Sequence, residues 1–319
     1  MKRMIRLILC CLTLAGCPQK IWCQQEPLFA QYRINAFVLN PAFAGSERHH
    51  ELRFGTRMQW QSMAGAPATY TFSYHGQTDE NSGIGGIIFS DRVGPSVRNG
   101  LQLAYAYRLP IGQPGLAGQN TLSLGFSGKI IRHRFAADRV TFVTPDDPAA
   151  SDASQGIAVA DAALGFYWRN EQFFAGFSIP NLIQSEFGAY VPSQTDRSLI
   201  SQLARHYFFM TGYRLRYIAY SVEPSILIRK TQGTPYQIEG TIKWYLKDDR
   251  VIVGLGYRTE WLGTMFLAVQ GTHYLLAYSA DFMLLPPNAS TLTYGPSHEL
   301  TLGLNLGRSW NQMFRGEDY

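Results

Sequence analysis

The sequence lacks cysteine outside its first 23 residues. All four cysteines (Cys10, Cys11, Cys17 and Cys23) lie in that leader, which excludes the small disulfide-stapled class of secreted domains. After the leader there is no apolar run of roughly 18 residues, the length that indicates a membrane-spanning helix. Charged residues make up only 16% of the chain, against roughly 25% in a typical soluble domain. These absences point away from an ordinary soluble protein.

Sequence patterns of enzymes are also missing. No nucleophile elbow, zinc-protease helix motif or phosphate-binding loop occurs, and Gly83-Ile84-Gly85-Gly86 is interpreted as the start of a glycine-rich strand. The aspartates of loop 138–155 fit no EF-hand spacing, and His49-His50 lacks an accompanying cysteine or carboxylate cluster. We therefore expect no enzymatic activity, no cofactor and no bound metal, although a serine–histidine pair on a barrel wall stays an open alternative.

Residues 1–23 have the pattern of a secretory signal peptide. Lys2, Arg3 and Arg6 precede a short apolar stretch. Cleavage after Cys23 would leave a mature chain that starts at Gln24, whereas Leu14-Ala15-Gly16-Cys17 reads as a lipobox in which Cys17 would be acylated. The leader carries four basic residues and no acidic one, so removing it lowers the net charge from +5 to +1. We see no clustered basic patch and expect no binding to nucleic acid.

What the sequence does contain is strict alternation of apolar and polar or small residues. Aromatic residues and glycine are abundant, which favours a sheet. In one example, Leu101, Leu103 and Tyr105 alternate with Gln102 and Ala104, so that one face is apolar. Fourteen such segments occur, near 51–60, 67–76, 83–90, 99–109, 119–131, 157–168, 172–179, 205–214, 217–229, 235–246, 250–258, 262–270, 274–284 and 297–307.

An even number of antiparallel strands about 9–11 residues long is typical of a bacterial outer-membrane barrel. We therefore predict an all-β fold, a transmembrane antiparallel β-barrel of about 14 strands over residues 51–307. A soluble β-sandwich or propeller is the alternative. The loops favour the barrel, because the three longest connections follow odd-numbered segments and short turns follow even-numbered ones, apart from the stretch 110–118. Tryptophans lie near the ends of the segments, as expected at a membrane interface: Trp60, Trp168, Trp244, Trp261 and Trp310.

A series of short motifs runs in order along the mature chain. It opens with Phe29-Ala30-Gln31-Tyr32 and Asn40-Pro41-Ala42-Phe43-Ala44-Gly45. Later members include Arg57-Met58-Gln59-Trp60, Tyr105-Ala106-Tyr107-Arg108, Glu223-Pro224-Ser225, Gly254-Leu255-Gly256-Tyr257-Arg258 and Ser297-His298-Glu299. In this order the motifs resemble the PorP/SprF family of outer-membrane proteins of Bacteroidota.

The resemblance implies a fourteen-stranded barrel that works in type IX secretion or gliding motility. It also implies partners: outer-membrane lipid, surface adhesins with a C-terminal sorting domain, and a periplasmic lipoprotein ring or a peptidoglycan-binding protein. The chain would assist export or surface anchoring of the adhesins. The alternative is an outer-membrane channel for hydrophobic small molecules, similar to the fatty-acid transporters. The tail after the last segment, residues 308–319, departs from the usual ending of a barrel.

Residues 24–50 precede the first segment and show little alternation. A fourteen-stranded barrel leaves a lumen to fill, so we expect this region to pack in or against the periplasmic mouth as a plug; a flexible tether is the alternative. Phe29, Tyr32, Phe37 and Phe43 are its expected anchors. Other residues of the family motifs are expected to take part in the plug or its contacts: Gln31, Asn40, Pro41, Gly45 and Trp60.

Four charged residues interrupt apolar segments: Arg57, Arg108, Glu223 and Arg258. A charge that faces lipid at mid-bilayer is costly, so we expect these side chains to point into the lumen and to pair there or contact the plug. For Arg108 and Arg258 a position in the headgroup region is an equal alternative. Pro224 cannot donate to a β-ladder and predicts a local bulge.

Overall fold

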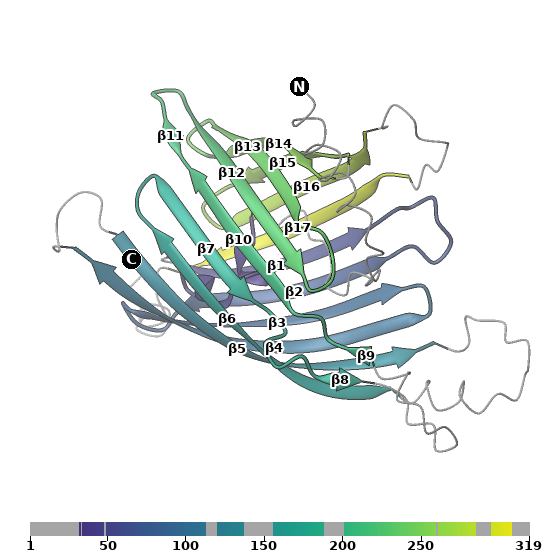
Figure 1. The fold of residues 1–319 in the computed structure, drawn as a ribbon. Coiled ribbons are helices and arrows are strands. Elements are labelled where there is room, and N and C mark those ends of the chain that lie inside the picture. The colour runs from purple at the N-terminus through teal and green to yellow at the C-terminus, as the bar shows by residue number, and fades with distance from the viewer. Residues whose placement is uncertain are drawn as a thin grey trace, which may run out of the picture.

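The computed structural model describes residues 32, 34–47, 49–112, 120–136, 156–187, 201–259, 261–284 and 295–307. Within these ranges fourteen antiparallel strands form one closed ring (Figure 1). They are β1 (His50–Met58), β2 (Ala68–Gln77), β3 (Ser82–Val93), β4 (Ser96–Ile111), β5 (Asn120–Phe135), β6 (Ile157–Arg169), β7 (Phe173–Ile179), β10 (His206–Tyr213), β12 (Tyr220–Thr231), β13 (Gln237–Leu246), β14 (Val251–Arg258), β15 (Leu262–Gln270), β16 (Tyr274–Met283) and β17 (Ser297–Leu306).

Each of the fourteen predicted segments corresponds to one strand of the ring, which confirms the predicted barrel. The first and last strands close it, from the pair His50 and Leu306 to the pair Met58 and His298. The two-residue strand β11 (Leu215–Arg216) continues the line of β10 along β12. A separate small hairpin joins β8 (Glu186–Phe187) to β9 (Ser201–Gln202).

The outer face of the ring is apolar. On β4 the outward side chains Leu101, Leu103 and Tyr105 are 45%, 63% and 49% exposed, whereas inward Ala104 and Ala106 are buried. So large an apolar surface is unfavourable in water and suits the hydrocarbon core of a bilayer. Among the residues described, no helix has the length and hydropathy needed to cross a membrane.

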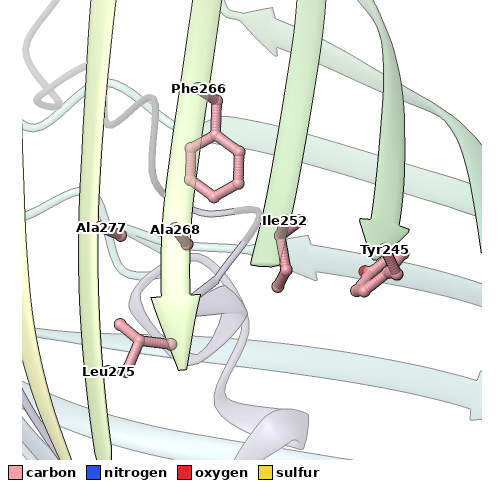
Figure 2. Close-up of a cluster of buried hydrophobic side chains, with 6 residues drawn as sticks. All are labelled: Tyr245, Ile252, Phe266, Ala268, Leu275 and Ala277. Carbon is pink, nitrogen blue, oxygen red and sulfur yellow. The ribbon is translucent and has the colours of Figure 1, made fainter. Parts of the chain in front are cut away.

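The inner face is mostly polar or small. It also carries apolar patches, one formed by Phe208, Met210 and Leu227 of β10 and β12, and another on β13 to β16. Figure 2 shows this inner-wall patch, which β13 to β16 contribute: Tyr245, Ile252, Phe266, Ala268, Leu275 and Ala277. Ile34, from the segment before β1, packs against it. The prediction of a small or polar second face is therefore wrong here, because an apolar side chain from the N-terminal segment covers this part of the wall.

Pro224 forms no bulge, which corrects the prediction from its sequence. Residues 220–229 of β12 pair with 246–237 of β13 without a shift of register. On the other side, the pairs Gly212–Ser225 and Leu215–Val222 also keep one register. Because proline has no N–H, the pairing along this edge of β12 is interrupted between β10 and β11, and no residue is inserted.

The two ends of the barrel differ. β1 begins and β17 ends at one end, which we call the proximal end; it also carries the short turns 170–172, 247–250 and 271–273. The strand ends that flank the long connections 136–156, 180–205 and 284–296 lie at the opposite, distal end. In outer-membrane barrels short turns face the periplasm and long loops face outwards, so the proximal end is the periplasmic one.

The expected tryptophans follow this division. Trp60 and Trp261 lie beside strand ends at the distal end, and Trp168 and Trp244 lie near strand ends at the proximal end. Trp310 and the tail 308–319 fall outside the described residues, as do the loop 138–155 and all of the leader. Residues 113–119 are also outside the described ranges. Because β4 extends to Ile111 and β5 begins at Asn120, the connection predicted at 110–118 starts after Ile111 instead.

Candidate functional site

Residues 34–47 lie inside the ring and are called the plug here. Two short 3₁₀ turns shape it, η3 (Ala36–Val38) and η4 (Pro41–Phe43). Asn40 caps η4, since its Oδ1 accepts a hydrogen bond of 2.9 Å from the backbone N of Ala42, and Pro41 suits the first position of a helical turn. In the Asn-Pro motif, Asn40 is thus a single extended residue between the two turns, and Pro41 starts the second turn within the lumen.

Glycines of the barrel wall make room for the plug. A Cβ at Gly165 of β6 would overlap the Asn40 side chain, and one at Gly125 of β5 would overlap the backbone of Ala42. A Cβ at Gly85 of β3 would lie 2.5 Å from the ring of Phe37. We call Gly85, Gly125 and Gly165 the glycine track. Its absence of side chains lets the wall approach the plug closely.

Polar bonds fix the plug along the same wall. Asn40 Nδ2 donates to the carbonyl oxygens of Phe166 (2.9 Å) and Phe177 (3.3 Å). Ser178 Oγ donates to the carbonyl oxygen of Leu39 at 2.6 Å. Because Asn40 is only 1% exposed, each of these bonds is shielded from water. The structure thus gives Asn40 one role in shaping the plug and a second in attaching it.

Two arginines hold the plug at the proximal mouth. Arg108 of β4 donates to the carbonyl oxygens of Ala44 (3.2 Å) and Gly45, and also to that of Ser82 (2.7 Å). Arg169 of β6 pairs with Glu47 at 2.8 Å. Five N–H donors in a planar fork allow one guanidinium to bind several carbonyls at once. The headgroup alternative for Arg108 is therefore not what the structure shows.

The turn that Arg108 contacts is itself capped. Asp79 lies between β2 and β3, and its Oδ1 accepts hydrogen bonds of 2.8 Å from the backbone N of Asn81 and of Ser82. These N–H donors hold the pKa of the exposed Asp79 carboxyl below its usual value. Gly45 approaches the same turn with φ +63°, and a Cβ there would lie 2.9 Å from Cα of Gly83. Glycine is required at that position.

A buried ion-pair cluster lies near the distal end of β1. Arg57 binds Asp281 at 2.7 Å and Glu299 at 3.0 Å, and all three side chains are at most 4% exposed. Thr264 donates to Asp281 at 2.8 Å. One cation thus faces two carboxylates inside the lumen.

Tyr32, which precedes the plug, reaches a second ion-pair cluster. Tyr32 OH donates to Glu239 Oε1 at 2.9 Å, and Arg258 binds the same carboxylate at 2.7 Å. Arg229 lies 3.6 Å from Glu239. The structure therefore places Arg258 in the lumen and brings Tyr32 to it. Phe29 and Gln31 fall outside the described residues.

A third cluster borders the plug on the side away from the glycine track. Glu223 pairs with Lys243 at 2.6 Å and accepts from Tyr245 OH at 3.0 Å. A separate group on β1 and β2 also lines the lumen, where Glu51 pairs with Arg53 at 2.9 Å and contacts His75 at 3.4 Å. These carboxylates each have two or more partners.

Between the plug and these strands lies a cavity of about 540 Å³. Ser46, Gly271 and Thr272 contribute to its lining, so it reaches the proximal mouth. Four residues of the inner-wall patch line it, and so do the charged side chains of Glu51 and Glu223. A cavity of this size, apolar on one side with a few convergent polar groups, is suited to binding a ligand.

The structure brings together some of the predicted residues and separates others. Tyr32, Phe37, Asn40, Pro41 and Gly45 are buried in the lumen. Phe43, a predicted anchor, is half-buried and stacks on Tyr167 with ring centroids 3.9 Å apart. Trp60 instead follows β1 at the distal end, where its backbone N donates to Ser297 Oγ at 3.3 Å, away from the plug.

Sequence reasoning missed the wall partners of the plug. Gly85 was interpreted only as part of a glycine-rich strand start, and no contact with the plug was predicted for the glycine track, Arg169 or Glu239, because strand glycines and strand-end charges are common and give no local signal. Glu299 stood within a family motif, and that motif was the available signal for the carboxylate that Arg57 binds. Within the described ranges, no three His, Cys, Asp or Glu side chains converge as a metal site would need.

Residues 22–304 match the family described as type IX secretion system membrane protein PorP/SprF. No curated protein matches the sequence.

Among solved structures, the chain is similar to a mutant of the monoaromatic hydrocarbon channel TodX, with 10% identity and a TM-score of 0.40 over 85% of this chain and 92% of that one. The KdgM porin has 8% identity and a TM-score of 0.36 over 81% of this chain and 98% of that one. The ferric enterobactin receptor PfeA has 10% identity and a TM-score of 0.39 over 76% of this chain and 45% of that one, so this chain spans less than half of that receptor.

Proposed function

The chain belongs to the PorP/SprF family of type IX secretion system membrane proteins, and from this we propose that its plugged barrel assists the export or surface anchoring of adhesins that carry a C-terminal sorting domain. Its barrel resides in the outer membrane. The role proposed is structural and non-enzymatic: the barrel presents a docking face to secretion partners at the periplasmic mouth.

One observation carries this proposal, the attachment of the plug to the wall. Arg108 and Ser178 of the wall donate to plug carbonyls, Asn40 of the plug donates to β6 and β7, and the glycine track lets the wall approach the plug closely. A lumen filled in this way is suited to a rigid platform, since binding sites are held best on rigid elements. The mouth then offers fixed backbone and the open cavity to periplasmic partners, among which we propose a lipoprotein ring or a peptidoglycan-binding protein.

Deleting the gene in the native bacterium and complementing it tests this function. Adhesins on the cell surface would be counted by mass spectrometry of surface-cleaved peptides. We expect the deletion to remove them and the wild-type gene to restore them. A variant that lacks residues 24–47 should reach the outer membrane yet restore little surface adhesin, and co-purification from detergent extracts should then lose the periplasmic partners. Unchanged surface adhesin in the deletion strain would contradict the proposal.

A second candidate function rests on the inner-wall patch. Four residues of this patch line the cavity, Tyr245, Ile252, Phe266 and Leu275, and such a surface would hold a hydrophobic small molecule. An uptake channel of this kind predicts a growth defect of the deletion strain on one hydrophobic nutrient with surface adhesin intact. Measuring growth and surface adhesin in the same deletion strain therefore distinguishes the two functions.

A further inference from the structure

The outer face of the barrel changes from apolar to basic at the distal ends of β3, β4 and β5, which lie side by side (Figure 1). Ile88, Leu101 and Ile130 share one outward row, and they are 57%, 45% and 58% exposed. The next row towards the distal end holds Ser90, Asn99 and Arg132. The boundary between lipid-facing and polar surface thus falls within one step along the strands.

The row beyond contains two more arginines. Arg92 pairs in register with Val97, and Val97 pairs with Arg134, so the two exposed arginines flank a single strand. Strand spacing places their Cα atoms about 10 Å apart, and Arg132 lies about 7 Å from Arg134 along β5. Three guanidinium groups therefore gather on one outward patch, which we call the arginine patch: Arg92, Arg132 and Arg134.

No acidic residue of the described strands pairs with Arg92 or Arg134. Asp91, next to Arg92 in the chain, points into the lumen, where it binds Thr69 at 2.6 Å and Arg98 at 2.5 Å. Arg92 and Arg134 have no ion-pair or hydrogen-bond partner among the residues that the structure describes. Their charge is therefore available to an external anion.

A hollow adjoins the arginine patch on the same outer face. It measures about 790 Å³, and Met58, Ala68, Tyr70 and Arg92 line it together with the small residues Gly65 and Gly94. Met58, Ala68 and Arg92 stand in one outward row across β1, β2 and β3. Small side chains at the floor and an arginine at the edge make a concave surface at the level of the headgroups.

We propose that the arginine patch and the hollow bind a phosphate-bearing lipid headgroup of the outer leaflet. A guanidinium binds phosphate through two parallel hydrogen bonds, which gives geometry as well as charge. The position just beyond the apolar band is where lipid phosphates lie, and tyrosine is favoured at this depth. The hollow beside Arg92 would hold the sugar or glycerol part of the same lipid.

The test uses the full mature chain reconstituted in phosphatidylcholine nanodiscs. Binding of lipid A with two phosphates is measured by native mass spectrometry for wild type, Arg92→Gln/Arg134→Gln and Arg92→Lys/Arg134→Lys. Arg250→Gln is the matched control, since Arg250 is an exposed arginine in a turn at the proximal end. We expect the glutamine pair to weaken binding about tenfold or more and the lysine pair to weaken it less. The control should bind as wild type does.

Several outcomes would overturn the proposal. Equal binding by the glutamine pair, or by lipid A stripped of its phosphates, would show that these arginines do not recognise a phosphate. Competition by inorganic phosphate at the same concentration as lipid A would make the patch a site for free anions and remove the lipid assignment. Band shift on heating in SDS gels checks that each variant is folded. If the glutamine pair does not fold, the lysine pair decides, and unchanged affinity there counts against bidentate recognition.

Discussion

Asn40 of the plug and Gly165 of β6 occupy touching positions, with the Asn40 amide lying where a Cβ of residue 165 would be. The same amide donates to the carbonyl oxygen of the neighbouring Phe166 at 2.9 Å. Plug and wall are therefore complementary in shape and in hydrogen bonding at this point. This relationship makes the attachment of the plug testable by adding or removing single groups.

Replacing Gly165 by alanine should displace Asn40 and weaken the hold on the plug. We expect the free energy of unfolding in urea to fall by about 1–3 kcal/mol, the usual cost of an added methyl group in a packed site. Gly128→Ala in β5 is the matched control, because no atom lies within 4 Å of a Cβ there. Equal loss in the two variants would mean that the position beside Asn40 is not special.

Removing the charge of Arg57 should leave Asp281 and Glu299 buried without their cation. We expect Arg57→Met to lower the free energy of unfolding by about 3–5 kcal/mol, because an uncompensated charge in the lumen is costly. The triple variant Arg57→Met/Asp281→Asn/Glu299→Gln should recover most of that loss. Urea titrations followed by tryptophan fluorescence measure both, and a triple variant no more stable than the single one would refute the explanation.

Loss of the Arg108 side chain should loosen the proximal part of the plug. Arg108→Ala removes the donors to Ala44, Gly45 and Ser82, and we expect conductance through planar bilayers to rise above that of the wild type. Arg108→Lys should give an intermediate conductance, since an ammonium lacks the planar fork. Arg216→Ala is the control, as Arg216 is exposed at the same end and donates only to the Glu171 carbonyl oxygen among described residues. Conductance equal to wild type in Arg108→Ala would show that other contacts hold the plug.

Glu223 and Lys243 should behave as one unit. Glu223→Gln and Lys243→Met each leave a buried charge without its partner, and we expect each to cost about 3–5 kcal/mol. The double variant should cost clearly less than the sum of the two single losses. A double-mutant cycle in urea measures this coupling; strictly additive losses would indicate that the 2.6 Å contact contributes nothing.

Much of the wall could be predicted from the sequence because its cause is local. Alternation within one strand, as at Leu101 and Gln102, is set by neighbours two residues apart. The inward direction of Arg57 followed in the same way, since a charge towards lipid is costly whatever its partner. Fold class, strand number and strand positions are all properties of this kind.

The contacts within the lumen could not be predicted, because they depend on how the ring closes. Arg57 and Glu299 are 242 residues apart in sequence, and only the pairing of β1 with β17 brings them together. The prediction of a bulge at Pro224 failed for a similar reason, since the register of β12 is set by β13 along its whole length. The glycine track likewise has meaning only once the plug is in place.

The pairing of β1 with β17 also constrains the order of assembly. Until the last strand arrives, the remaining strands form an open sheet, and the glycine track lies on an accessible surface where residues 36–45 can settle from the side. Once β17 joins β1, that approach is closed, and the segment can enter only by threading lengthwise through the mouth. The N-terminal segment is thus available as a template around which the sheet curls, and Ile34 can cover the inner-wall patch only once β13 to β16 have formed.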